Sequence, residues 1–72
     1  MAIFRVGEKD GKELFVKEID SANHTLSFTE NRHEAMKKDD GFYADAERDF
    51  LKFHFSEQYP NEIGQLAVIR EY

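Results

Sequence analysis

Apolar and polar residues alternate along the first part of the chain in a pattern that predicts three short strands. The segments AIFRV, ELFVKEID and TLSFT are rich in β-branched and aromatic residues spaced by two, which is typical of half-buried strands. In the second segment we expect Phe15 and Ile19 to share one face of the sheet. The Asp10-Gly11 pair is a hairpin signal, because glycine accepts the positive φ that a tight turn requires. The three segments therefore predict a β-meander.

The period changes in the segment ENRHEAMKK, which favours a short helix. Asn31 is a suitable N-cap, and Glu34 completes a capping-box-like pair three residues later. Ala35 and Met36 would then face the sheet. Gly41 favours the left-handed conformation found just after a helix, so we expect the short helix to stop or bend before it.

A longer helix is predicted from Phe42 to Gln58, because YADAERD carries alanines and charges without a period of two. It should end before Pro60, since the residue preceding a proline avoids the α region, and YPNEIGQ should form a loop. On a helical wheel the apolar residues gather on one side. We expect this side to face the core, with Phe50 and Phe53 as its main contacts. The side comprises Phe42, Tyr43, Ala46, Phe50, Phe53 and His54.

The final segment, LAVIREY, has apolar residues on both faces, which predicts a strand in the interior of the sheet. We expect it beside the first strand, parallel or antiparallel. The order β-β-β-α-α-β predicts an α+β fold: a small antiparallel β-meander plus a C-terminal strand, with one short and one longer helix packed on one face.

Size and composition define how such a fold is stabilised and where it works. The 72 residues suffice for one domain, spanning 1–72, and without cysteine its stability must come from apolar burial. No stretch approaches the roughly 20 apolar residues of a membrane span. The start, MAIFRVGEKDGK, lacks the basic and apolar regions of a secretory signal. We therefore expect a cytoplasmic protein without a membrane partner.

The net charge of −5 arises from residues 39–72, where acids outnumber bases, whereas residues 1–38 are balanced. Phosphate backbones attract basic surfaces, so direct nucleic-acid binding is disfavoured. The acids are densest in an acidic strip that a basic surface could bind, or that could imitate nucleic-acid phosphates. The acidic strip comprises Asp39, Asp40, Asp45, Glu47 and Asp49.

Histidines and carboxylates are the candidates for chemistry, and neither set forms a motif. His24, His33 and His54 lack the spacing of a metal-binding pair. The acidic strip lies on a loop and a polar helix side, without the burial that acid–base catalysis needs or the spacing of a calcium loop. The glycines are scattered singly, which excludes a phosphate loop. We expect no metal, no cofactor and no enzymatic activity.

Leu51 and Phe55 lie one turn apart and outside the apolar side of the predicted helix. Either the loop around Pro60 folds over them, or they remain exposed beside the acidic strip. An exposed apolar pair with a charged rim is typical of a protein-contact surface. We therefore expect a contact site whose anchors are Leu51 and Phe55, with Asp45, Asp49 and Lys52 as the rim and Asp39 and Asp40 in the preceding loop.

The order of these segments resembles small accessory proteins of phages and prophages in Gram-positive bacteria. The resemblance rests on the Asp-Gly turn, ELFVKEID, TLSFTENRHEAMKK with its threonine-containing segment from Thr29 to Glu34-Ala35, an alanine-and-phenylalanine helix, and the closing AVIREY. It implies the cytoplasm of a bacterial host and a protein partner from host or phage. We expect a non-enzymatic interaction module, monomeric or a small homo-oligomer, that modulates or inhibits a host protein. An acidic nucleic-acid mimic is the alternative.

Overall fold

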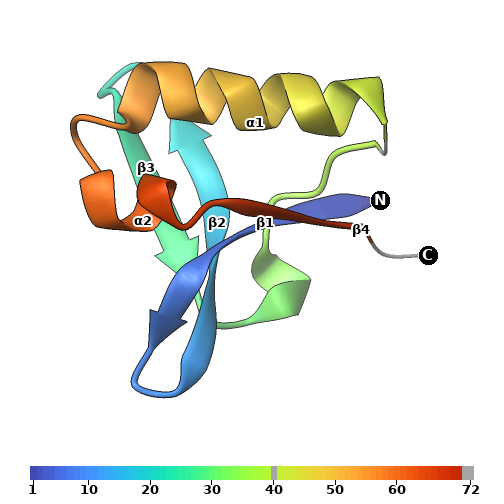
Figure 1. Ribbon diagram of the computed structural model, residues 1–72, viewed down its shortest axis with the longest axis vertical. Helices are drawn as coiled ribbons and strands as arrows, with labels where there is room; N and C mark the ends of the chain where they lie inside the picture. The colour runs from blue at the N-terminus through green and yellow to red at the C-terminus, as the bar shows by residue number, and fades with distance from the viewer. Residues whose placement is uncertain (40, 71–72) are drawn as a thin grey trace.

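The computed structural model describes residues 1–39 and 41–70 and confirms the α+β fold class. Four strands, a single 3₁₀ turn (η1) and two helices follow one another along the described chain (Figure 1). The elements are β1 (Ala2–Lys9), β2 (Lys12–Asp20), β3 (Thr25–Thr29), η1 (Arg32–Glu34), α1 (Phe42–Phe55), α2 (Pro60–Gly64) and β4 (Ala67–Arg70).

The strands form one antiparallel sheet in the order β3-β2-β1-β4. The expected place of the last strand beside the first is confirmed, and Ile3 pairs with Ile69 in an antiparallel register. The expected interior position is wrong, because β4 lies at the edge. Both of its faces are nevertheless apolar, since Val68 and Ile69 pack against clusters on opposite sides of the sheet.

A two-residue turn joins β1 to β2, as the Asp-Gly pair predicts. Lys9 pairs with Lys12, and the residues between them, Asp10 and Gly11, have φ values of 54° and 81°. Positive φ at both central residues matches the right-handed twist of the flanking strands. The hairpin is therefore specified locally.

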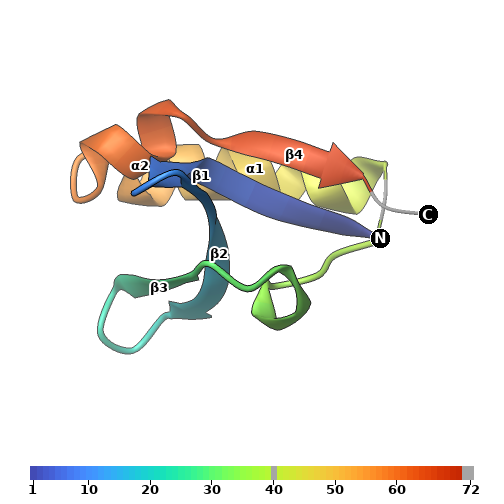
Figure 2. The ribbon, with the colours of Figure 1, turned by 90° about the horizontal axis from the view of Figure 1, so that it is seen from below.

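Farther along β2, the pairing with β3 shifts register between Val16 and Glu18. An extra residue in one strand reverses the face on which the following side chains lie. Ile19 therefore packs on the same side as Val16, and its expected place beside Phe15 is wrong. β2 also bends, carrying β3 away from the β1–β4 pair (Figure 2).

The main core lies between the sheet and the helices α1 and α2, which cover the same face. Its buried members are Phe4, Val6, Val16, Leu26, Leu51, Phe55 and Ile63. A smaller cluster of Ile3, Phe15 and Ala35 occupies the other face, where the Arg32 guanidinium lies 5.6 Å from the centre of the Phe15 ring. The aromatic and branched side chains of the strands therefore pack on both faces of the sheet.

The short helix expected at Asn31 is only the single 3₁₀ turn η1. The Asn31 side chain caps it by accepting a hydrogen bond from the His33 N–H (2.9 Å). The chain then becomes extended, and Ala2 and Lys38 exchange two backbone hydrogen bonds of 2.7 and 2.9 Å. Hydrogen bonding to the sheet replaces hydrogen bonding within a helix, which ends the turn early.

The longer helix begins at Phe42 as predicted and ends at Phe55, before the expected limit at Gln58. The expected loop contains α2, with Pro60 in its first turn. Proline suits this position because its fixed φ is helical and its missing N–H would have no partner there. Pro60 therefore starts α2, whereas α1 has already ended at Phe55.

Candidate functional site

Leu51 and Phe55, the expected exposed anchors, belong to the main core. Their exposed fractions are 0% and 2%, so this part of the predicted contact site is wrong. The chain after α1 folds back as the alternative expectation required: Ile63 joins the same cluster, and the Tyr59 ring lies 6.2 Å from that of Phe55. Burial of this pair fixes the orientation of α1.

The apolar side identified on the helical wheel is real, but it faces away from the core. The buried residues of α1 are Ala44, Leu51 and Phe55, a narrow stripe on the opposite side of the helix. A helical wheel shows which residues share one side of a helix. It does not show whether that side faces the core or water. Phe50 and Phe53, the expected core contacts, are therefore on the surface.

We call the outward side of α1 the aromatic face, and it carries four of the five large apolar side chains that are exposed among the described residues. The exposed fractions are 79% for Phe42, 65% for Tyr43, 39% for Phe50 and 83% for Phe53, and Ala46 between them is also exposed. In Figure 1, α1 runs along one edge of the molecule, and the sheet lies on the inner side of this helix. The aromatic face comprises Phe42, Tyr43, Ala46, Phe50 and Phe53.

The exposed apolar area of this face is larger than that of a single exposed aromatic side chain. An aromatic side chain presents about 150–250 Å², so the exposed fractions correspond to about 400–650 Å² of aromatic surface. The largest apolar patch on a typical monomer measures about 300–600 Å² and is often functional, and the aromatic face is of this size. The aromatic face therefore has the properties of a contact surface.

Two histidines lie beside the C-terminal end of the aromatic face. The His54 ring is 4.4 Å from that of Phe50 and 5.0 Å from that of Phe53. His24 stacks on Phe55 at 4.6 Å, and its Nε2 lies 3.0 Å from the His54 carbonyl oxygen, a bond in which the ring donates. These contacts tie the β2–β3 turn to the end of α1.

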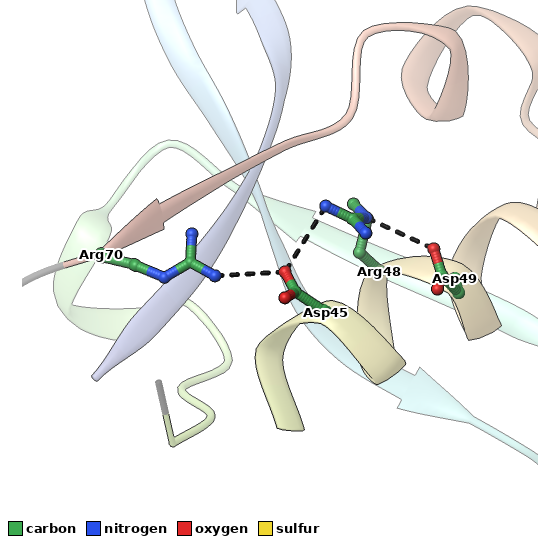
Figure 3. A network of polar contacts seen from close by, with 4 residues as sticks. All are labelled: Asp45, Arg48, Asp49 and Arg70. Carbon is green, nitrogen blue, oxygen red and sulfur yellow. Dashed lines mark hydrogen bonds and ion pairs between the residues drawn. The ribbon is translucent and has the colours of Figure 1, made fainter. Parts of the chain in front are cut away.

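Carboxylates of the acidic strip form ion pairs with bases of the same chain. Asp45 accepts from Arg70 on β4 at 3.1 Å and lies 3.4 Å from Arg48, which also reaches Asp49 at 3.3 Å (Figure 3). The network links α1 to the edge strand of the sheet. Asp45 therefore turns toward β4, away from the expected rim position.

The remaining residues of the predicted site differ in their positions and contacts. Asp39 and Lys52 are exposed, and Asp49 lies next to the aromatic face on α1. Glu47 pairs with Lys38 at 3.7 Å. Asp40 lies outside the described residues. Because Leu51 and Phe55 are buried, the predicted rim has no exposed anchors to surround.

Further observations concern the whole of the described chain. Within residues 1–39 and 41–70, no three His, Asp or Glu side chains are grouped as metal ligands would be. None of the helices in these ranges combines the length and apolar character needed to cross a membrane. Comparisons with protein-family models, with curated proteins and with solved structures find no match to this chain.

Proposed function

We propose that this chain is a non-enzymatic protein-interaction module that binds its partner through the aromatic face of α1. The observation that carries the proposal is the outward position of four aromatic side chains on one helix. Aromatic residues are enriched at protein interfaces, where they bury a large area at a small cost in side-chain entropy.

The surroundings of the aromatic face support this role. Asp49 lies on α1 beside the aromatic face and gives the apolar surface a charged border, whereas Lys52 lies farther round the helix, outside this border. Interfaces commonly combine an apolar centre with a polar rim. The resemblance to phage accessory proteins suggests a host protein as the partner, in which case binding would modulate that protein.

The acidic nucleic-acid mimic receives less support. A phosphate mimic needs carboxylates that are free to meet a basic partner. Asp45 and Asp49 are engaged with Arg48, and Glu47 with Lys38. Bases of the same chain therefore reduce the negative potential that a mimic requires.

The test is affinity capture from a bacterial lysate by the immobilised chain, followed by mass spectrometry. The double substitution Phe42→Ser and Phe53→Ser should abolish specific capture while preserving the circular dichroism spectrum, because both side chains are about four-fifths exposed. The matched control is Lys52→Ser on the same helix, which should retain capture. A partner held equally well by the double variant would refute the proposal.

A further inference from the structure

The spacing of the aromatic face points to one particular occupant. Tyr43, Ala46, Phe50 and Phe53 follow one another at intervals of three, four and three residues along α1. This is the spacing of the contact seam between two paired helices. We propose that the occupant is the same face of a second copy of this chain, with the two α1 helices packed antiparallel. This inference rests on the proposed function, since the second copy uses the same surface and would compete with a host protein for it.

The side-chain sizes along the seam favour the antiparallel arrangement. With the twofold axis near residue 48, Phe50 of each copy lies opposite Ala46 of the other, so a large side chain fills the space beside a small one. Tyr43 and Phe53 then meet at both ends as aromatic pairs. A parallel pair would instead place alanine against alanine and leave a void at that layer.

The area available approaches the lower limit for a specific dimer. The aromatic side chains of two copies would bury about 800–1,300 Å², which overlaps the lower end of the 1,200–2,000 Å² range of stable interfaces. Ala46 and the adjoining His54 ring are also exposed and add to this area. A twofold arrangement uses the same patch on both copies, so it satisfies both aromatic faces at once.

Charges near the axis set a limit on the strength of the contact. In the antiparallel arrangement Asp49 and Glu47 flank the seam, and each lies near the same residue of the second copy. Both carboxylates are ion-paired within their own chain, to Arg48 at 3.3 Å and to Lys38 at 3.7 Å. The pairing reduces the repulsion between like charges. Asp49→Asn should therefore strengthen the dimer.

Sedimentation equilibrium of the purified chain tests the inference, at protein concentrations up to about 1 mM. The unmodified chain should form a dimer. Phe53→Ser should weaken it by about 30-fold or more, because it removes the aromatic pair with Tyr43 at both ends of the seam. Ala46→Phe should also weaken it by overfilling the central layers, although it makes the surface more apolar. Lys52→Ser, off the seam, should leave the dissociation constant unchanged.

The outcomes separate this inference from the proposed function. A monomer at 1 mM would overturn the second copy as occupant, whereas the aromatic face could still capture another protein in the lysate experiment. A dimer insensitive to Phe53→Ser and Ala46→Phe would also overturn the inference, because another surface, such as the edge of β3 or β4, would then hold it. Tighter association of Ala46→Phe would indicate non-specific apolar adhesion and refute the seam.

Discussion

At the scale of single residues, Leu51 and Phe53 lie two positions apart on α1 and have opposite roles. Leu51 is fully buried in the main core, whereas Phe53 projects from the aromatic face with an exposed fraction of 83%. The contribution of each residue to folding stability therefore depends on its burial and not on its number of apolar atoms.

Leu51→Ala should lower the free energy of unfolding by about 2–5 kcal/mol, because it leaves a cavity in the main core. A domain of this size is stable by only about 4–11 kcal/mol, so the substitution would remove a large part of its stability. Phe53→Ala should change this free energy by no more than about 0.5 kcal/mol. Urea denaturation at low protein concentration, where the chain is monomeric, measures both; equal effects would contradict the assigned orientation of α1.

Asp20 provides a pH-dependent contact in the β2–β3 turn. The Asn23 side chain donates to one carboxylate oxygen at 2.8 Å and the Asn23 backbone N–H donates to the other at 3.1 Å. These hydrogen bonds hold the pKa of Asp20 below its ordinary value of 3.8. The folded state favours the ionised form, so the stabilisation is present above pH 3.8 and is lost as the pH falls through the lowered pKa.

Asn23→Ala should raise the pKa of Asp20 toward its ordinary value. Carboxyl chemical shifts followed by NMR titration measure this change directly. Stability should then depend less steeply on pH in the acid range, because the folded and unfolded pKa values approach each other. An unchanged pKa in the variant would show that other groups in the turn, and not Asn23, set it.

At the scale of elements, the helices and the sheet are joined by a few side chains from the last third of the sequence. The Leu26 N–H on β3 donates to the Tyr59 hydroxyl at 3.0 Å, and the Tyr59 ring packs edge-to-face on Phe28 at 5.4 Å. The segment between α1 and α2 thus positions the edge strand β3. Local sequence patterns do not predict such contacts, because the residues involved lie far apart in the sequence.

Tyr59→Phe removes the hydroxyl and retains the ring. The free energy of unfolding should fall by about 0.5–1.5 kcal/mol, because the Leu26 N–H loses its acceptor. Amide hydrogen exchange at Leu26 should accelerate more than exchange in β1, which lies inside the sheet. Uniform acceleration across all strands would mean that Tyr59 acts on global stability alone.

Most element types followed from the sequence because their causes are local, although α2 was expected to be a loop. The Asp-Gly turn, the strand periodicity and the start of α1 at Phe42 depend on neighbouring residues and were predicted correctly. The end of the short helix and the face of Ile19 were not, because each depends on hydrogen bonds with a distant strand. The strand order matched because apolar content distinguishes the first and last strands.

At the scale of the whole molecule, α1 carries two apolar stripes, and only one can face the sheet. The stripe of Ala44, Leu51 and Phe55 is inside, so the larger aromatic face remains available for association. A second copy on that face would bury the helix on both sides. Folding and association would then share one helix.

Association through the aromatic face should make the melting temperature depend on protein concentration. A hundredfold increase should raise it by on the order of 5 °C, because binding stabilises only the folded chain. Phe53→Ser should melt at one temperature throughout, whereas Lys52→Ser should follow the unmodified chain. Differential scanning calorimetry provides the measurement. A concentration-independent melting temperature for the unmodified chain would argue against self-association.

The sequence by itself determined the α+β class, the meander, the hairpin and the presence of an amphipathic helix, because periodicity and turn chemistry act within a few residues. It also identified the aromatic side of that helix as a group. Only the tertiary structure decided which side faces water. The reason is physical: the stripe that is buried depends on Ile63 and Tyr59, which close over Leu51 and Phe55 from a separate segment. The packing of the core therefore decides the candidate site, because the residues of the site are the apolar residues of α1 that the core does not bury.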